Sequence, residues 1–137
     1  SAVSRERSAP AINLEAALHT LAQGIASTQI ELELAPVARD LSPRCAHALL
    51  RCVQEAVTNS VRHAGATRVS ITLTQQGDHE DARVRVRVED NGRGARKLRP
   101  GNGLQSMQER MAELRGSAQV LRSWPGFQIE LSCPRRA

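Results

Sequence analysis

The stretch Gln54-Glu55-Ala56-Val57-Thr58-Asn59-Ser60-Val61-Arg62-His63-Ala64 predicts a helix with two unlike sides. Its valines continue an apolar stripe that begins upstream at Leu49 and Val53. Residues about one turn apart are neighbours on a helix. Three polar residues therefore share the other side: Glu55, Asn59 and Arg62. One side is suited to a core and the other to chemistry.

The helix has clear boundaries in the sequence. Ser42-Pro43 offers a capping hydroxyl and a proline at the first helical position, and Gly65 stops the helix after Ala64. Other spacings predict helices from Leu14 to Ile25 and from Leu104 to about Gly116, and strands over 28–34, 67–75, 82–90, 117–123 and 127–133. We expect an α+β two-layer sandwich, with helices on one face of a mixed, mostly antiparallel sheet.

Length and charge limit the classes of function. The 137 residues suit one domain over 12–137, with 1–11 expected to be disordered or a boundary segment. No apolar run approaches the roughly 20 residues of a membrane helix, so we expect no direct membrane contact. The net charge of +5 comes from scattered arginines, and the only aromatic residues are Trp124 and Phe127. This pattern argues against nucleic-acid binding, which uses basic grooves with stacking platforms.

The cysteines and histidines show no metal-ligand spacing. Cys45 and Cys52 share a helix face and are expected to be small core residues, with Cys133 elsewhere in the chain. An odd number of cysteines in this pattern favours a reduced, cytoplasmic setting.

The polar side of the first helix has the groups for a magnesium site. Magnesium takes few protein ligands and keeps water and phosphate oxygens around it, so the Asn59 amide oxygen would suffice to orient it. Glu55 could bind a metal-bound water or act as a base, and Arg62 could pair with phosphate. An ordinary solvated helix face explains the same residues equally well.

Asp90 ends a valine-rich strand and is followed by Gly92 and Gly94. A carboxylate walled by apolar residues can accept a hydrogen bond from the exocyclic amine of adenine. Guanine presents an oxygen there, and an unpaired buried acceptor costs about 1–3 kcal/mol. The alternative is a plain Asp-Asn-Gly turn.

Gly101-x-Gly103 precedes the helix that begins at Leu104. Free backbone amides at a helix start suit phosphate oxygens, although a flexible loop explains the glycines equally well. The order of the three segments, on helix, strand and loop, predicts a site for a metal-bound nucleoside triphosphate.

These segments resemble the N, G1 and G2 boxes of the ATP-binding domain of bacterial sensor histidine kinases. That domain shares its Bergerat fold with Hsp90, DNA gyrase B and MutL. The runs Gln54–Asn59, Arg62–Ala64 and Gly103–Gly116 resemble the short-lid subclass of nitrate-sensor and DesK-like kinases, which work with LuxR-type response regulators. The resemblance covers about residues 14 to 134.

The resemblance implies a role for each matching residue. Asn59 would hold magnesium and, with Glu55 one turn earlier, serve catalysis, while Asp90 would bind the adenine amine. The other implied nucleotide-binding residues are Arg62, His63, Gly92, Gly94, Gly101, Gly103 and Leu104. His63 is equally well explained as a helix-end residue. Residues 95–100 would form the short lid.

The resemblance also implies the partners. The domain would bind Mg-ATP and deliver the γ-phosphate to a histidine on its own upstream dimerisation domain, and a LuxR-type regulator would receive it. We expect a monomer in the cytoplasmic portion of a membrane-bound sensor kinase, with His19 not the acceptor. The stimulus and the cognate regulator are not encoded in these motifs.

The chain departs from the family at one place. The family often has a Gly-Thr pair before the last strand, whereas here Ser123-Trp124-Pro125-Gly126 is followed by Phe127. The hydroxyl that would support the adenine pocket is therefore missing. An anti-sigma-type serine kinase, a non-catalytic nucleotide sensor and a basic interaction module are the alternative functions.

Overall fold

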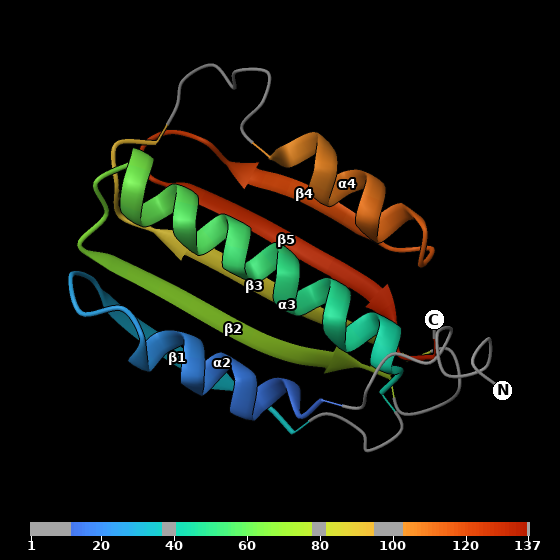
Figure 1. Ribbon diagram of the computed structural model, residues 1–137. Coiled ribbons are helices and arrows are strands. Elements are labelled where there is room, and N and C mark those ends of the chain that lie inside the picture. The colour runs from blue at the N-terminus through green and yellow to red at the C-terminus, as the bar shows by residue number, and fades with distance from the viewer. Residues whose placement is uncertain (1–11, 37–40, 78–81, 95–102, 137) are drawn as a thin grey trace, which may run out of the picture.

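A single mixed sheet organises the part of the chain that the structure describes (Figure 1). The computed structural model describes residues 12–36, 41–77, 82–94 and 103–136. The strands are β1 (Gln29–Leu34), β2 (Arg68–Gln76), β3 (Arg83–Asp90), β4 (Ser117–Arg122) and β5 (Phe127–Pro134). Their order is β1-β2-β3-β5-β4, with β1 and β2 parallel and the other neighbours antiparallel. The predicted mixed, mostly antiparallel sheet is confirmed.

The α-helices of the described residues cover one face of this sheet (Figure 1). They are α2 (Leu14–Gln23), α3 (Pro43–Thr58) and α4 (Leu104–Ala112). The Ser42 side chain accepts a hydrogen bond from the Cys45 amide at 3.4 Å, and Pro43 opens α3, so the predicted helix start is confirmed. No helix in these described stretches has the length and apolarity to span a membrane. The two-layer α+β fold follows from this arrangement.

The core lies between α3 and the middle of the sheet. On β3 the valines point inward and are buried, while the alternating arginines lie on the opposite face. Leu49, Val53 and Val57 of α3 are at most 1% exposed and pack in the same cluster. Burying each such side chain contributes about 1.5–3 kcal/mol. This packing fixes α3 along the strands and thereby places its polar side.

The last turn of the long helix differs from the prediction. The α-helix ends at Thr58, and Asn59–His63 form a π-helical turn, η1, in which the Ala64 amide donates to the Asn59 carbonyl at 3.1 Å. The helix thus ends near Ala64 as predicted, and only the π-helical form of its last turn was not expected. The Ala66 amide closes the end of this turn on the Ser60 carbonyl at 3.0 Å, and the Arg93 amide, from the chain after β3, donates to the Ala64 carbonyl at 2.9 Å.

The cysteines also correct the prediction. Cys45 in the first turn of α3 forms a disulfide with Cys133 near the end of β5, so the expectation of a fully reduced set of thiols was wrong for this structure. The bond joins residues 88 apart in sequence, and only the tertiary fold brings them together. Cys52 is free and buried, and burial raises its pKa to about 11.

Candidate functional site

The predicted segments meet at the end of the sheet where β3 stops and β5 starts. Asp90 is the last residue of β3, and its inward position continues the valine side of that strand. It is 5% exposed and lies opposite Phe127 in the β3–β5 register. η1 ends over the same edge, which places a buried carboxylate beneath the last turn of the long helix.

Two donors from different elements hold the Asp90 carboxylate. The Gly92 amide donates to Oδ1 at 2.9 Å, and the Ser60 hydroxyl donates to Oδ2 at 2.5 Å. Hydrogen bonds to an ionised carboxylate are roughly twice as strong as neutral ones. A carboxylate has about four lone-pair directions, so two bonds leave acceptor capacity for a ligand. The acid is both buried and able to accept.

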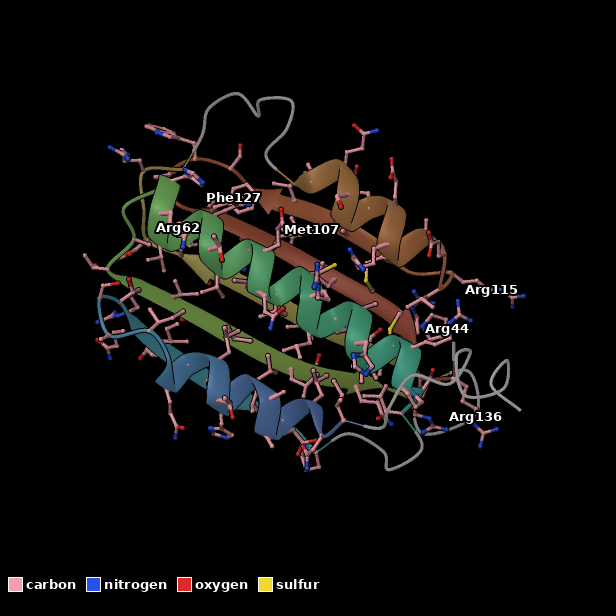
Figure 2. The ribbon with its side chains drawn as sticks, in the orientation of Figure 1. Arg44, Arg62, Met107, Arg115, Phe127 and Arg136 are labelled. Carbon is pink, nitrogen blue, oxygen red and sulfur yellow. A yellow bond between two sulfur atoms is a disulfide. The ribbon has the colours of Figure 1, made fainter. Side chains whose placement is uncertain are left out.

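The polar side of the helix lies next to this acid. Asn59 precedes Ser60 directly and is partly buried, and Glu55 lies one turn earlier and is exposed. Arg62 and His63 are exposed, and Arg62 and Phe127 lie toward the same end of the molecule in Figure 2. The side chains of Glu55 and Asn59 offer oxygen donors to a cation.

These oxygen atoms suit a cation that takes few ligands from the protein better than one that the protein surrounds completely. Within the described ranges, no group of three or more histidine, cysteine or acidic side chains is arranged to hold a metal ion. One amide oxygen and one carboxylate suit magnesium, which keeps several waters and takes its other oxygens from phosphate.

Gly92 lets the chain after β3 lie against the end of η1. A Cβ built on Gly92 would stand 2.6 Å from the Ala64 carbonyl oxygen and 2.7 Å from the Ala64 Cβ. Arg93 closes the same contact, because its amide donates to the Ala64 carbonyl at 2.9 Å and its guanidinium to the His63 carbonyl at 3.0 Å. Gly94 lies in turn against the β4–β5 connection at Ser123 and Gly126.

Gly103 connects α4 to the polar side of α3. It has φ of 88°, which favours glycine, and a Cβ built there would collide with the Glu55 carboxylate. Its carbonyl accepts the first helical bond, from Met107 at 3.0 Å, so Leu104 lies at the start of α4. The structure thus brings Glu55 against Gly103, and Ser60 and Gly92 against Asp90, and Asn59 lies between Glu55 and Ser60 along the helix. Gly101 and the predicted lid over 95–100 lie outside the described residues.

Sequence reasoning missed two residues at this edge. Ser60 stands beside Asn59 and looks like an ordinary small helix residue, although its spacing from Ala56 places it on the buried side. Asn91, which follows Asp90, is the second of them. Its Oδ1 accepts from the amides of Thr67 and Arg68, at 3.0 and 2.9 Å, and so fixes β3 to the start of β2.

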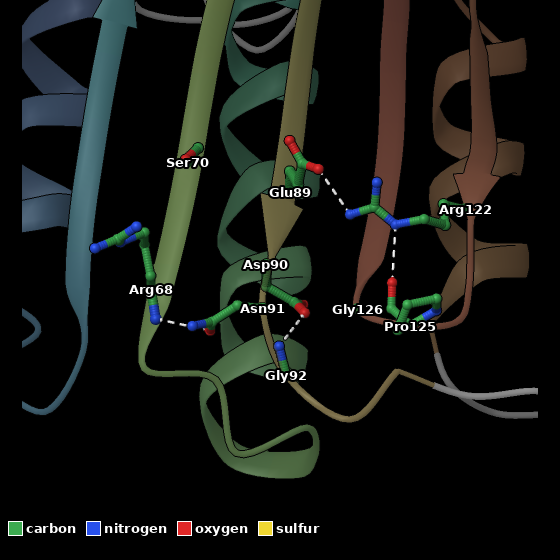
Figure 3. A pocket seen from close by; sticks show the side chains of 9 residues that line it. All are labelled: Arg68, Ser70, Glu89, Asp90, Asn91, Gly92, Arg122, Pro125 and Gly126. Carbon is green, nitrogen blue, oxygen red and sulfur yellow. Dashed lines mark hydrogen bonds and ion pairs between the residues drawn. The ribbon is translucent and has the colours of Figure 1, made fainter.

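A cavity of about 460 Å³ lies on the other side of the same strand ends. Figure 3 shows its lining side chains in front of the sheet, with α3 behind. Arg122 reaches Glu89 at 2.6 Å and the Pro125 carbonyl at 2.8 Å there, and Arg68 forms the opposite rim. Asp90 is among the lining residues, but its carboxylate bonds to Ser60, which belongs to the helix on the other side of the sheet.

Comparison with known proteins identifies the family of the chain. The family model described as "Histidine kinase-, DNA gyrase B-, and HSP90-like ATPase" matches residues 46–137. The chain is 37% identical over 81 residues to the sensor histidine kinase YvfT of Bacillus subtilis, covering 58% of this chain and 21% of that protein. It is 38% identical over 96 residues to the sensor histidine kinase MctS of Rhizobium johnstonii, covering 66% of this chain and 20% of that protein. The chain thus spans about a fifth of these curated relatives.

A solved structure shares the fold. The ATP-binding domain of PrrB from Mycobacterium tuberculosis superposes with a TM-score of 0.59 at 21% identity, covering 90% of this chain and 92% of that one. At this identity the likeness concerns the fold. It confirms the predicted layers and sheet for this chain.

Proposed function

Because the chain belongs to the family of histidine kinase-, DNA gyrase B- and HSP90-like ATPases, we propose that residues 12–137 form the ATP-binding catalytic domain of a two-component sensor histidine kinase. One observation carries the proposal at the level of the site. The buried Asp90 carboxylate is bonded to Ser60, and Ser60 directly follows Asn59. A purine-reading acid and a cation-binding amide are therefore adjacent in space.

Asp90 selects the base. Its free acceptor capacity, in an apolar surrounding, suits the exocyclic amine of adenine. The oxygen of guanine would face the carboxylate oxygen there, and leaving such a buried acceptor unpaired costs about 1–3 kcal/mol. Gly92 and Gly94 keep the chain beside Asp90 close to η1 and the β4–β5 connection. The site prefers ATP over GTP on these grounds.

Asn59 holds the cation, and Glu55 lies within one turn to orient a metal-bound water. Bound magnesium supplies charge neutralisation along the phosphates. Arg62 and His63 stand on the exposed side of η1, where they meet the nucleotide. Gly101 and Gly103, before α4, and Leu104, its first residue, meet the phosphates. Phosphoryl transfer needs mainly this positioning and charge neutralisation.

The domain presents the γ-phosphate to a histidine on a separate dimerisation domain of the same kinase. The N-box and G2-box residues support the short-lid subclass, whose regulators are of the LuxR type. A cytoplasmic location and a monomeric isolated domain complete the proposal. His19 lies on α2, which sits beside β1 (Figure 1), and in this proposal the acceptor is a histidine of the dimerisation domain instead.

Titration calorimetry with ATP, ADP and GTP, each with and without magnesium, tests the nucleotide site. We expect ATP and ADP to bind, magnesium to strengthen ATP binding, and GTP to bind at least tenfold more weakly, which is about 1.4 kcal/mol. Equal binding of GTP and ATP would exclude Asp90 as the purine reader.

Transfer is tested by adding labelled ATP with and without a supplied phosphoacceptor domain. Acid-labile label on the supplied histidine supports the kinase. Acid-stable label on a serine indicates an anti-sigma-type kinase. ATP binding without transfer indicates a nucleotide sensor, an alternative motivated by the missing Gly-Thr pair before β5, whose first residue, Phe127, lies opposite Asp90.

A further inference from the structure

The Asp90 carboxylate accepts a hydrogen bond from a hydroxyl side chain on the helix rather than from one on the last strand. Ser60 and Asp90 are 3% and 5% exposed, and the hydroxyl donates to Oδ2. Phe127, the β5 residue opposite Asp90, has no polar atom in its side chain to donate. Within the described ranges, the side-chain donor to this acid is the Ser60 hydroxyl.

We propose that Ser60 is a positioning residue that fixes the Asp90 carboxylate for recognition of the adenine amine. The inference rests on the proposed nucleotide site. Rotation about the last carboxylate bond is broad and roughly two-fold in its preferences. The Gly92 amide on Oδ1 and the Ser60 hydroxyl on Oδ2 together set that rotation. The remaining lone pairs then point in a fixed direction, which a ligand amine can meet without reorganisation.

The hydroxyl has one proton and two nearby acceptors. Ser60 Oγ also lies 3.1 Å from the Ala56 carbonyl oxygen. An ionised carboxylate is a stronger acceptor than a backbone carbonyl. The Ser60 hydroxyl therefore donates its hydrogen bond to Asp90 rather than to Ala56. If the acid is replaced, the hydroxyl returns to Ala56 and stays satisfied within its own helix. The Ser60 hydroxyl therefore has an acceptor whether or not the Asp90 carboxylate is present.

The position of Ser60 gives the acid a hydroxyl donor although Phe127, the residue opposite on β5, carries none. A threonine at 127 would donate to the acid from β5, across the strand pair. Directly opposite residues in such a pair have Cβ atoms about 4.5–5.5 Å apart, which is within reach of a short hydroxyl side chain. Ser60 supplies the same chemical group from η1.

The test compares ATP with purine riboside triphosphate, which lacks the exocyclic amine. We expect Ser60→Ala to weaken ATP binding about tenfold, the scale of one hydrogen bond to a charged group, and to leave the affinity for the amine-free nucleotide near the wild-type value. The preference for ATP would therefore collapse. A merely structural role would weaken binding of both nucleotides to the same degree.

A rescue variant sharpens the test. In Ser60→Ala/Phe127→Thr, a threonine on β5 supplies the hydroxyl that Ser60 has lost. We expect most of the preference for ATP to return, although threonine is smaller than phenylalanine and packs less well against the core. Phe127→Thr alone is the matched control and should keep the preference. Thermal unfolding of each variant shows whether a loss of binding follows from a loss of fold.

The outcomes separate this inference from the proposed function. Wild-type protein that binds neither nucleotide overturns the proposed function and the inference together. Wild-type protein that binds both equally removes Asp90, and with it Ser60, from purine recognition. A wild-type preference for ATP that persists in Ser60→Ala, or an equal loss for both nucleotides, overturns the role of Ser60 alone.

Discussion

Asp90 is the residue at which sequence pattern and chemistry conflict most clearly. Its position continues an inward series of valines, so a hydrophobic residue would stabilise the fold more simply. Burying a charge is costly unless it is hydrogen-bonded. The Gly92 amide and the Ser60 hydroxyl meet that requirement, and the acceptor capacity that remains serves a ligand. A buried charge that costs stability thus stands where it can accept a hydrogen bond from a ligand.

Asp90→Asn should weaken ATP binding about 10- to 100-fold, since a hydrogen bond to a charged group is worth about 1.5–3 kcal/mol. The amide keeps the volume and loses one acceptor oxygen and the charge. Calorimetry measures the change. Glu89→Gln is the control, because Glu89 lies next to Asp90 but pairs with Arg122 on the opposite face of the sheet. Equal affinities in wild type and Asp90→Asn would remove Asp90 from the adenine role.

Asn59→Ala should abolish the strengthening of ATP binding by magnesium while leaving magnesium-free binding close to wild type. The reason is that the variant removes the amide oxygen assigned to the cation and no part of the Asp90 contact. The measurement is the ratio of ATP affinities with and without magnesium. Thr58→Ala, at the exposed preceding position, is the control. If the ratio is unchanged in Asn59→Ala, the cation is held elsewhere.

The sequence predicted these two residues because each combines an unusual residue type with a clear context. Asp90 closes a valine strand before two glycines, and Asn59 lies on the polar side of a strongly amphipathic helix. Ser60 could not be predicted in the same way. Its role depends on a contact with a residue 30 positions away, and a serine within a helix carries no local sign of that partner.

At the scale of elements, the site depends on close approach between the end of η1 and the chain after β3. Gly92 and Ala64 touch through backbone atoms, and Arg93 bonds across the same contact. Alternation along the strands and the Ser42-Pro43 start were sufficient to predict the main elements. The π-helical turn was not predictable, because its residues carry no local sign of it and it occurs where Ser60 and Ala64 bond to the end of β3 and the chain after it.

Gly92→Ala should separate these elements. The added methyl would overlap the Ala64 backbone, which cannot move as a flexible side chain does, so we expect a loss of about 1–3 kcal/mol in the free energy of unfolding together with weaker ATP binding. Urea denaturation measures the first. Gly24→Ala is the matched control, since a Cβ there would meet its nearest atoms at 3.6 Å and Gly24 has φ of −77°. Similar stability losses in both variants would contradict the proposed contact.

At the scale of the whole molecule, the two ends of α3 are fixed in different ways. The end near Asn59 is held by hydrogen bonds to the loops of the site. The start is tied to the end of β5 by the Cys45–Cys133 disulfide and by the Ser42 amide, which donates to the Arg135 carbonyl at 2.7 Å. The covalent attachment thus lies far from the nucleotide side. It was not predictable from cysteine spacing, since the pairing exists only in the folded chain.

Reduction of the disulfide should lower the free energy of unfolding by about 2–4 kcal/mol, because the cross-link restricts the unfolded chain over a long loop. Urea denaturation with and without reductant measures this difference. The Cys45→Ala/Cys133→Ala variant should be insensitive to reductant. Cys52 remains protonated at neutral pH, as burial raises its pKa to about 11, and so does not take part in exchange. Identical unfolding curves of wild type in both conditions would contradict the bond.

Asn59 and Ser60 share one peptide unit within η1. Asn59, which we assign to the cation, therefore cannot move without Ser60, which orients the base-reading acid. A substitution that converts this π-helical turn into regular α-helix would displace both side chains and so weaken cation binding and base recognition together. Anyone re-engineering the domain for a different nucleobase should accordingly alter the strand side of the contact, at positions 90 and 127, and leave that shared amide plane undisturbed.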